Sequence, residues 1–300
     1  MTGFIDEYKD LWGVQPICAQ LPIAPSTYYA IKSRPPSARS VSDAEMKAKI
    51  QRVYDDNYQV YGARKVWKQL LRDKVQVGRD QVARLMRQMG LRGASRGKVA
   101  RTTVPATDNR PEDLVNRQFE AAAPNRLWLA DLTYVWTVAG FCYVAFITDA
   151  FSRAIVGWRV SRSLTADLAL DALQMAIHSR GGEGLGELVH HSDRGVQYLS
   201  IRYTERLEQE GAVTSVGSKG DSLDNALAET VNGLYKTELI HRQGPWQSAD
   251  EIELATLRWV DWWNHRRLHG ACGDIPPLEF EAHYYRQLEE ASEQVSTPTV

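Results

Sequence analysis

From residue 126 onward, apolar and amphipathic segments follow one another in an order that few folds can accommodate. Three apolar segments separated by turn-like residues come first, at 126–136, 141–150 and 153–160. Runs of this length, bounded by turn residues, predict antiparallel strands. Helical and strand-like segments then alternate, at 165–180, 186–191, 200–211, 212–217 and beyond 222. This order predicts an α/β fold in which helices flank a mixed five-stranded sheet.

Composition limits the class of protein. The 300 residues, 43% of them hydrophobic and 24% charged, are typical of a globular chain with a real core. No apolar run approaches the roughly 18 residues of a membrane helix, and the start MTGFIDEYKD lacks the pattern of a signal peptide. Cys18, Cys142 and Cys272 are too few and too far apart for a disulfide framework or a CxxC zinc site. We therefore expect a reduced, cytoplasmic protein that makes no membrane contact.

The charge is distributed unevenly along the chain. The formal net charge is only −1, yet residues 31–110 contain 19 lysines and arginines against 7 acids. A basic block beside an acidic remainder predicts a module that binds a polyanion, and nucleic acid is the favoured partner. The alternative is that these are ordinary solvent-exposed helix surfaces.

Three amphipathic segments lie in the basic block: one begins at Ser42-Asp43, one spans 61–73 and one spans 77–90. Val66, Leu70 and Leu71 share one face of the second segment. The third segment turns apolar residues inward and arginines outward, namely Val82, Leu85 and Met86 against Arg79, Arg84 and Arg87. Two helices that are joined by a short turn, with arginines on the second helix, predict a helix-turn-helix DNA-binding module. A three-helix module for protein contacts is the alternative.

These patterns divide the chain into five expected parts. They are an N-terminal helical segment with its linker at 1–40, the all-α helix-turn-helix module at 41–98, a basic linker at 99–123, the α/β core with its C-terminal helix at 124–285, and a disordered tail at 286–300.

Three acidic residues lie at positions that are typical of catalytic or ligand-binding residues. Asp131 interrupts an apolar strand, where a charge is costly unless it has a partner. Asp193, in "HHSDRGVQY", directly follows the fourth strand, and α/β sheets bind ligands at strand ends. Glu229 lies in the last helix of the core, on a helical wheel that puts Leu223, Leu227, Val231 and Leu234 on one side and Asn225, Glu229, Asn232 and Lys236 on the other.

Three carboxylates without a cysteine or paired-histidine ligand set suit Mg²⁺ or Mn²⁺. Two such ions, about 3.5–4 Å apart, serve phosphodiester chemistry. Alternatively, each acid caps a helix or forms an ordinary salt bridge.

Neighbouring residues leave two questions open. Strand alternation sends His190 and His191 to opposite faces, so at most one lies behind Asp193 or contacts DNA. Arg266 and Arg267 are either phosphate contacts or the C-terminal cap of the long helix that precedes them.

The motifs around these acids resemble one family. Asp131 in "WLADLTYV", Asp193 in "HHSDRGVQY" and Glu229 in "SLDNALAETVNGLYKTEL" look like the DDE triad of retroviral-integrase-like transposases, and 35 residues separate the last two, as in that family. "YGARKVW", "LDNALAE", "LYKTEL" and "WWNHRRLHG" resemble more narrowly the OrfB product of insertion sequences of the IS-three family. The resemblance runs from about residue 20 to 285.

The resemblance implies an RNase H-like core whose carboxylates hold two Mg²⁺ or Mn²⁺ ions. It further implies DNA cleavage at insertion-sequence terminal repeats and strand transfer into target DNA by a homo-oligomer on DNA. We expect Lys236 at the DNA end, with Asn225 and Asn232 as further DNA contacts on the same helical face. In that family an upstream product with a helix-turn-helix and a leucine zipper is commonly fused to this one, so we expect it as a fused or associated partner. The alternative function is a DNA-binding regulator or inhibitor of transposition with an idle core.

Overall fold

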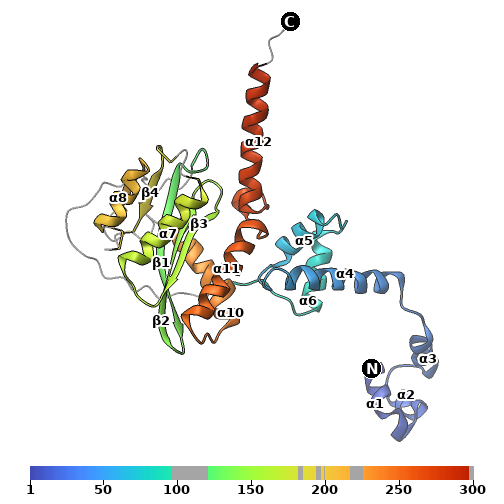
Figure 1. Ribbon diagram of the computed structural model, residues 1–300. Helices are drawn as coiled ribbons and strands as arrows, with labels where there is room; N and C mark the ends of the chain where they lie inside the picture. Colours follow the sequence, from blue (N-terminus) through green and yellow to red (C-terminus); the bar gives the residue numbers. More distant parts are fainter. Residues whose placement is uncertain (96–120, 182–184, 194–196, 199, 217–225, 297–300) are drawn as a thin grey trace. The chain divides into compact units, whose positions relative to one another are not determined.

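The computed structural model describes residues 1–95, 121–181, 185–193, 197–198, 200–216 and 226–296 (Figure 1). The chain divides into two compact units, Met1–Lys49 and Ile50–Val300. No helix in the described part combines the length and the apolar composition that a membrane crossing requires.

The first unit contains three short helices, α1 (Thr2–Trp12), α2 (Val14–Gln20) and α3 (Pro25–Ser33). A small core holds them together through Ile5, Ile17, Cys18 and Tyr28. The helix expected to begin at Ser42-Asp43 starts earlier in the structure, because α4 spans Ala38–Asp55. Ser37 caps this earlier start, since its side-chain oxygen accepts a hydrogen bond from the Ser40 amide at 3.2 Å.

Two further helices, α5 (Ala63–Arg72) and α6 (Arg79–Gln88), complete the predicted three-helix pattern. Their packing faces follow the sequence periodicity, since Val66, Leu70, Val82, Leu85 and Met86 are all buried. Leu71 is the exception. It is exposed, because the buried face of α5 centres on Val66 and Leu70 and leaves the next position at its edge.

The sheet has the predicted five strands and mixed pairing. Its order is β3 (Ile155–Ser161), β2 (Gly140–Asp149), β1 (Leu127–Thr137), β4 (Val189–Ser192) and β5 (Val213–Val216). The first three pair antiparallel, whereas β4 runs parallel to both β1 and β5. The fold is RNase H-like, as expected.

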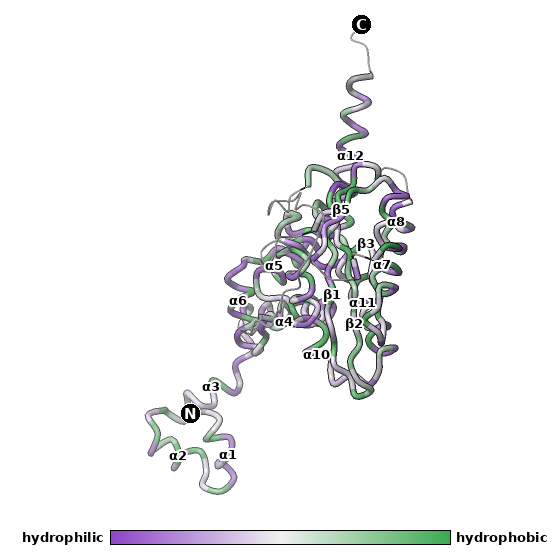
Figure 2. Tube along the Cα trace, turned by 90° about the vertical axis from the view of Figure 1, so that its left-hand side faces the viewer, coloured by the Kyte–Doolittle hydropathy of each residue, from purple (hydrophilic) through white to green (hydrophobic). Residues whose placement is uncertain are grey.

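Helices cover the two faces of this sheet. On one face, α7 (Ala166–Ser179) and α8 (Ile201–Gln209) enclose a core that includes Trp128, Ala130 and Ile147. On the other, α9 (Ala226–Tyr235) packs on β1, beside a small cluster of Leu127, Leu129, Ala150 and Ala228. Hydrophobic stretches of the trace gather in the strands and α7 (Figure 2).

The helical segment that carries α9 continues as a π-helical turn, η2 (Lys236–Ile240), and the short α10 (His241–Gln243). The aromatic-rich α11 (Ala249–His265) follows, and its Trp259 ring meets the Tyr235 ring edge to face with centroids 5.2 Å apart. A 3₁₀ turn, η3 (Gly270–Cys272), leads to α12 (Pro277–Ser296).

The expected disordered tail at 286–300 is wrong for most of its length, because α12 continues to Ser296. Residues 287–294, QLEEASEQ, are mostly strong helix formers that extend the preceding helix. The Ser, Thr and Pro residues that suggested disorder come only at the end of the chain.

Gly157 on β3 allows α7 to approach the sheet closely. A Cβ atom at this position would overlap the carbonyl oxygen of Ala172 and lie 2.9 Å from the Ala176 Cβ. We therefore expect Gly157→Ala to lower the free energy of unfolding by about 1–3 kcal/mol, since the helix backbone must shift. Urea denaturation measures the loss. Gly186→Ala is the control, because its Cβ would meet nothing within 4 Å; equal midpoints for the two variants would contradict this packing argument.

Candidate functional site

Strand pairing sets Asp131 and Asp193 at the same level. In the parallel ladder of β1 and β4, Leu129 pairs with His191 and Ala130 pairs with Ser192. Asp131 and Asp193 are the next residues on the two chains, and neighbouring strands lie about 4.8 Å apart. Both carboxylates therefore leave the sheet at one point, where β4 ends.

The Asp131 carboxylate is fixed by two hydrogen bonds. Its Oδ1 accepts from the Leu132 amide at 2.8 Å, and its Oδ2 accepts from Nδ2 of Asn232 at 2.8 Å. Asn232 lies on α9, one turn after the exposed Glu229. Glu229 is thereby carried to the same face of the sheet as the two aspartates.

The electrostatics show that the three acids are neighbours. Burial, followed by the negative charges of Asp193 and Glu229, raises the pKa of Asp131 to about 7. The two hydrogen bonds to Asp131 oppose this shift. A carboxyl group that shares its surroundings with two other acids is costly to ionise unless a cation is present.

Lys236 lies at the edge of this site. Burial lowers the pKa of its ammonium group, whereas the charge of Asp131 acts in the opposite direction. Its Nζ stands 4.5 Å from the centre of the Tyr134 ring on β1. The lysine is thus close enough to Asp131 to interact electrostatically, and the aromatic ring supports it from the other side.

The donors suit a hard divalent cation, although they are not gathered tightly around one point. Among the described residues, no group of three His, Cys, Asp or Glu side chains is close enough to hold a metal ion. The buried Oδ1 of Asn232 nevertheless has no hydrogen-bond partner among the described residues. Carboxylate and amide oxygens are ligands that Mg²⁺ and Mn²⁺ prefer, so the chemistry of the donor set fits such an ion.

The pairing of β1 with β4 shows which of the two histidines lies on the same face of the sheet as Asp193. His191 pairs with Leu129, whose side chain packs in the cluster that includes Ala228 of α9, so His191 points to the α9 side. Its Nδ1 lies 2.9 Å from the Ser215 hydroxyl. His190 points to the opposite core, 2.9 Å from the Tyr203 hydroxyl, and burial lowers its pKa to about 3.

The helical wheel for α9 needs a correction. The buried positions are Ala228, Val231, Asn232 and Tyr235, whereas Leu227 and Leu234 are only half-buried. Asn232 can lie in the buried face because its amide bonds to Asp131. It is therefore a positioning residue for that carboxylate. Leu223 and Asn225 lie outside the described residues.

Arg267 is not at a DNA-binding surface, and that prediction is wrong. It is buried and forms two hydrogen bonds to Glu238, from Nε at 2.9 Å and from Nη2 at 2.6 Å. Its guanidinium group also stacks on Trp263 at 4.5 Å. The run "NHRRLHG" gave no indication of this, because the partner lies 29 residues earlier in the chain.

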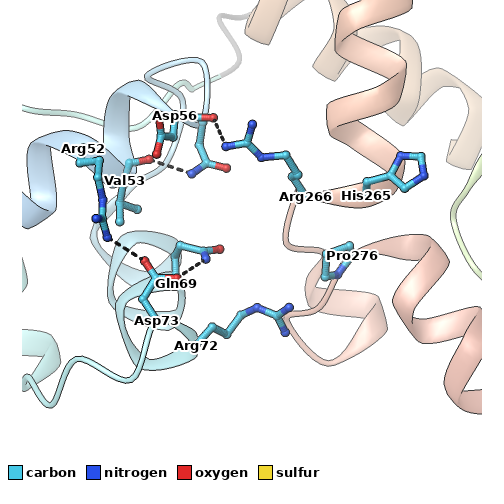
Figure 3. A pocket seen from close by; sticks show the side chains of 10 residues that line it. Arg52, Val53, Asp56, Gln69, Arg72, Asp73, His265, Arg266 and Pro276 are labelled. Atoms are coloured by element: carbon cyan, nitrogen blue, oxygen red, sulfur yellow. Dashed lines mark hydrogen bonds and ion pairs between the residues drawn. The ribbon is translucent and has the colours of Figure 1, made fainter.

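Arg266 is exposed but is held by a contact. Its Nη2 donates to the carbonyl oxygen of Asp56 at 3.2 Å, across a pocket of about 400 Å³ (Figure 3). Two further arginines line this pocket, and each is paired with an acid: Arg52 with Asp73 at 3.4 Å and Arg72 with Glu279 at 2.6 Å. The pocket thus lies in a seam between α4–α5 and the C-terminal segment, away from the three acids.

The remaining predicted DNA contacts lie on α6. Arg79 and Arg87 are exposed and Arg84 is half-buried. Sequence reasoning did not identify two other residues near the site, Tyr134 and Tyr198. The Tyr198 hydroxyl is buried and has no hydrogen-bond partner in the described part of the chain. Its pKa is raised by burial and by the nearby Tyr203, Asp131 and Asp193. Its place at the end of "HHSDRGVQY" was the one available indication.

Asp131 should lower the stability of the metal-free protein. Its folded pKa of about 7 exceeds its ordinary 3.8, so the folded state binds more protons than the unfolded state between these values. Stability contributed by this group is therefore lost as the pH rises from about 4 to about 7. We expect Asp131→Asn to raise the free energy of unfolding by about 1–3 kcal/mol at pH 8, and by less at pH 5.

Thermal denaturation in a chelating buffer at both pH values measures this effect. Asp167→Asn is the control, because Asp167 is an exposed residue paired with Arg202 and its loss should change little. A gain of the same size at pH 5 and pH 8 would show that charge repulsion is not its cause.

Known protein families match the helical module and the α/β core of this chain separately. Integrase core domain models match residues 121–222 and 210–277, and an HTH-like domain model matches residues 40–99. The HTLV-2 integrase catalytic core, solved in complex with magnesium in a trimeric form, aligns with 53% of this chain and 98% of its own, at 18% identity and a TM-score of 0.42.

Two relatives match nearly end to end. A protein of Mycobacterium tuberculosis (strain H37Ra) named for insertion sequence element IS986/IS6110 is 57% identical over 89% of this chain and 98% of its own length. The transposase for insertion sequence element IS629 of Shigella sonnei is 51% identical over 96% of this chain and 98% of its own. The chain therefore belongs to the IS-three family of insertion-sequence transposases, whose catalytic part is an integrase core domain.

Proposed function

We propose that the chain is a DNA transposase that cleaves insertion-sequence ends and joins them to target DNA in a divalent-metal-dependent reaction. The observation that carries the proposal is the arrangement of three acids on one face of the sheet: Asp131 and Asp193 just beyond the last paired residues of β1 and β4, and Glu229 on the facing helix. Membership of a transposase family and the similarity to the IS629 transposase support it.

Asp131, Asp193 and Glu229 would hold the metal, which we expect to be two Mg²⁺ or Mn²⁺ ions. When bound, the ions activate an attacking oxygen and stabilise the leaving one at a phosphodiester. Asn232 keeps the Asp131 carboxylate in place, and its Oδ1, which no described residue hydrogen-bonds, offers one more acceptor inside the site. A water molecule as nucleophile gives cleavage, and a DNA 3′-hydroxyl in the same position gives strand transfer.

Lys236 would neutralise a phosphate of the DNA end beside the acids, since it borders Asp131 and keeps its ammonium group half-exposed. Arg79, Arg84 and Arg87 on α6 would contact backbone phosphates away from the site, and Arg266 would do so at the rim of its seam. His191 would support Asp193 from within the sheet. His190 takes no part, because it faces the opposite core.

The two parts of the chain would have separate roles. The helices at 41–98 would bind DNA, and the core at 124–285 would carry the chemistry. Terminal repeats and target DNA are the proposed substrates, and we infer that two or more copies act together on DNA. An upstream product with a leucine zipper would associate with this chain or be fused to it.

Removing one acid tests the chemistry. We expect Glu229→Gln to reduce nicking and joining of a labelled terminal-repeat duplex at least about 100-fold in Mg²⁺ or Mn²⁺, because metal stabilisation of the transition state is worth several kcal/mol. Gel electrophoresis of the products measures both steps. A chelator should abolish them in the wild-type protein, and added Mn²⁺ should restore them.

Glu205→Gln is the matched control, since Glu205 is an exposed residue on α8. Equal activity of the wild type and Glu229→Gln would overturn the assigned chemistry. DNA binding by the wild type without products, even after fusion to the upstream zipper product, would identify a regulator with an idle core instead.

A further inference from the structure

Three aromatic side chains are exposed together on the β1–β2 hairpin. Tyr134, Trp136 and Phe141 are 56%, 64% and 50% exposed. The Trp136 and Phe141 rings meet edge to face at 4.6 Å, and the Tyr134 and Phe141 rings do so at 5.8 Å. We call these three rings the aromatic platform. Large rings that gather on an exposed surface usually mark an interaction site.

The aromatic platform stands on a rigid support. The opposite face of the hairpin is buried through Val135, Thr137 and Cys142. The turn is held from behind, because the amides of Val138 and Ala139 donate to the carbonyl oxygens of Trp246 and Gln247 at 2.9 and 3.1 Å. The hairpin extends beyond the end of α7, which covers the same face of the sheet further along (Figures 1 and 2). The rings are thus in place before any ligand arrives.

The aromatic platform and Asp131 lie on opposite faces of β1, because residues an odd number of positions apart on a strand point to opposite sides. Tyr134 follows Asp131 by three residues on β1, a distance of about 10 Å along the strand. Lys236 joins the two, since its Nζ lies over the Tyr134 ring and it interacts electrostatically with Asp131. Within the described residues, the pairing of β1 with β4 ends at Ala130, so this edge of β1 is unpaired from Asp131 to Thr137.

We propose that unpaired bases of a DNA end stack on the aromatic platform while Lys236 holds the phosphate between them and the acids. This inference rests on the proposed transposase function and adds a site to it. Aromatic rings bind single-stranded DNA by stacking with every kind of base, and a basic side chain follows the backbone. The platform spans a few nucleotides, since stacked bases rise about 3.4 Å each.

A second copy of this chain fits the observations less well. One side of a stable protein interface uses roughly 20–30 residues around an apolar centre. The aromatic platform has only three rings beside a lysine. Stacked bases with their phosphates use both the rings and the positive charge.

The test compares two DNA probes and needs no metal. One is a duplex with a four-nucleotide single-stranded end that contains 2-aminopurine, and the other is the blunt duplex of the same sequence. The wild-type protein should quench 2-aminopurine fluorescence on binding. Trp136→Ala should weaken binding of the single-stranded-end probe about 5- to 100-fold and leave blunt-duplex binding within about twofold. Trp136→Phe should restore most of the difference.

Tyr285→Ala is the control for an exposed aromatic residue, since Tyr285 lies on α12. Equal losses on both probes, or no loss, would overturn the proposal. A wild-type dimer in sedimentation experiments that Trp136→Ala converts to monomer, with unchanged quenching, would assign the platform to a second copy instead. Because binding is measured in chelating buffer, a failure of stacking remains distinct from a failure of cleavage, which Glu229→Gln reports.

Discussion

The parallel pairing of β1 with β4 is the constraint on which the acidic site depends. It sets Asp131 and Asp193 one residue beyond the last paired positions, Ala130 and Ser192. A shift of one residue in this register would turn Asp193 to the opposite face of the sheet. The carboxylate would then face the core that holds His190 and Tyr203, and Glu229 on α9 would lose one of its neighbours. The short strand β4 thus matters more for the site than its four residues suggest.

A second constraint holds the helix that supplies Glu229. The segment from α9 through η2 is continuous, and the π-helical turn buries Glu238, Leu239 and Ile240 together. Glu238 pairs with Arg267, and their isolation from water makes loss of either partner costly, although such a pair adds little net stability. The pair fixes the far end of this segment against the residues that follow α11. It thereby restricts how α9 can move relative to β1.

The order of strands and helices could be predicted because each element keeps its own periodicity. Asp131 and Asp193 could be found for a related reason, since one interrupts an apolar strand and the other ends one. Arg267 was misassigned because nothing near it in sequence distinguishes a buried guanidinium from an exposed one, and Glu238 becomes its partner only in the folded chain. The choice between His190 and His191 required the strand register, which alternation alone does not give.

Several residues around the acids place polar groups in buried positions, where apolar side chains would favour folding. Asp131 keeps a carboxyl group where burial and the neighbouring acids raise its pKa to about 7. Asn232 buries an amide oxygen that has no hydrogen-bond partner among the residues described. The Tyr198 hydroxyl is also buried, close to both aspartates, and no described residue forms a hydrogen bond with it. A sheet edge that served only folding would favour apolar side chains at these positions. Local conflict between residue and environment is expected where a site rather than the fold determines the sequence. Here the conflicts meet at the end of β4, where a bound cation would relieve the repulsion between the carboxylates.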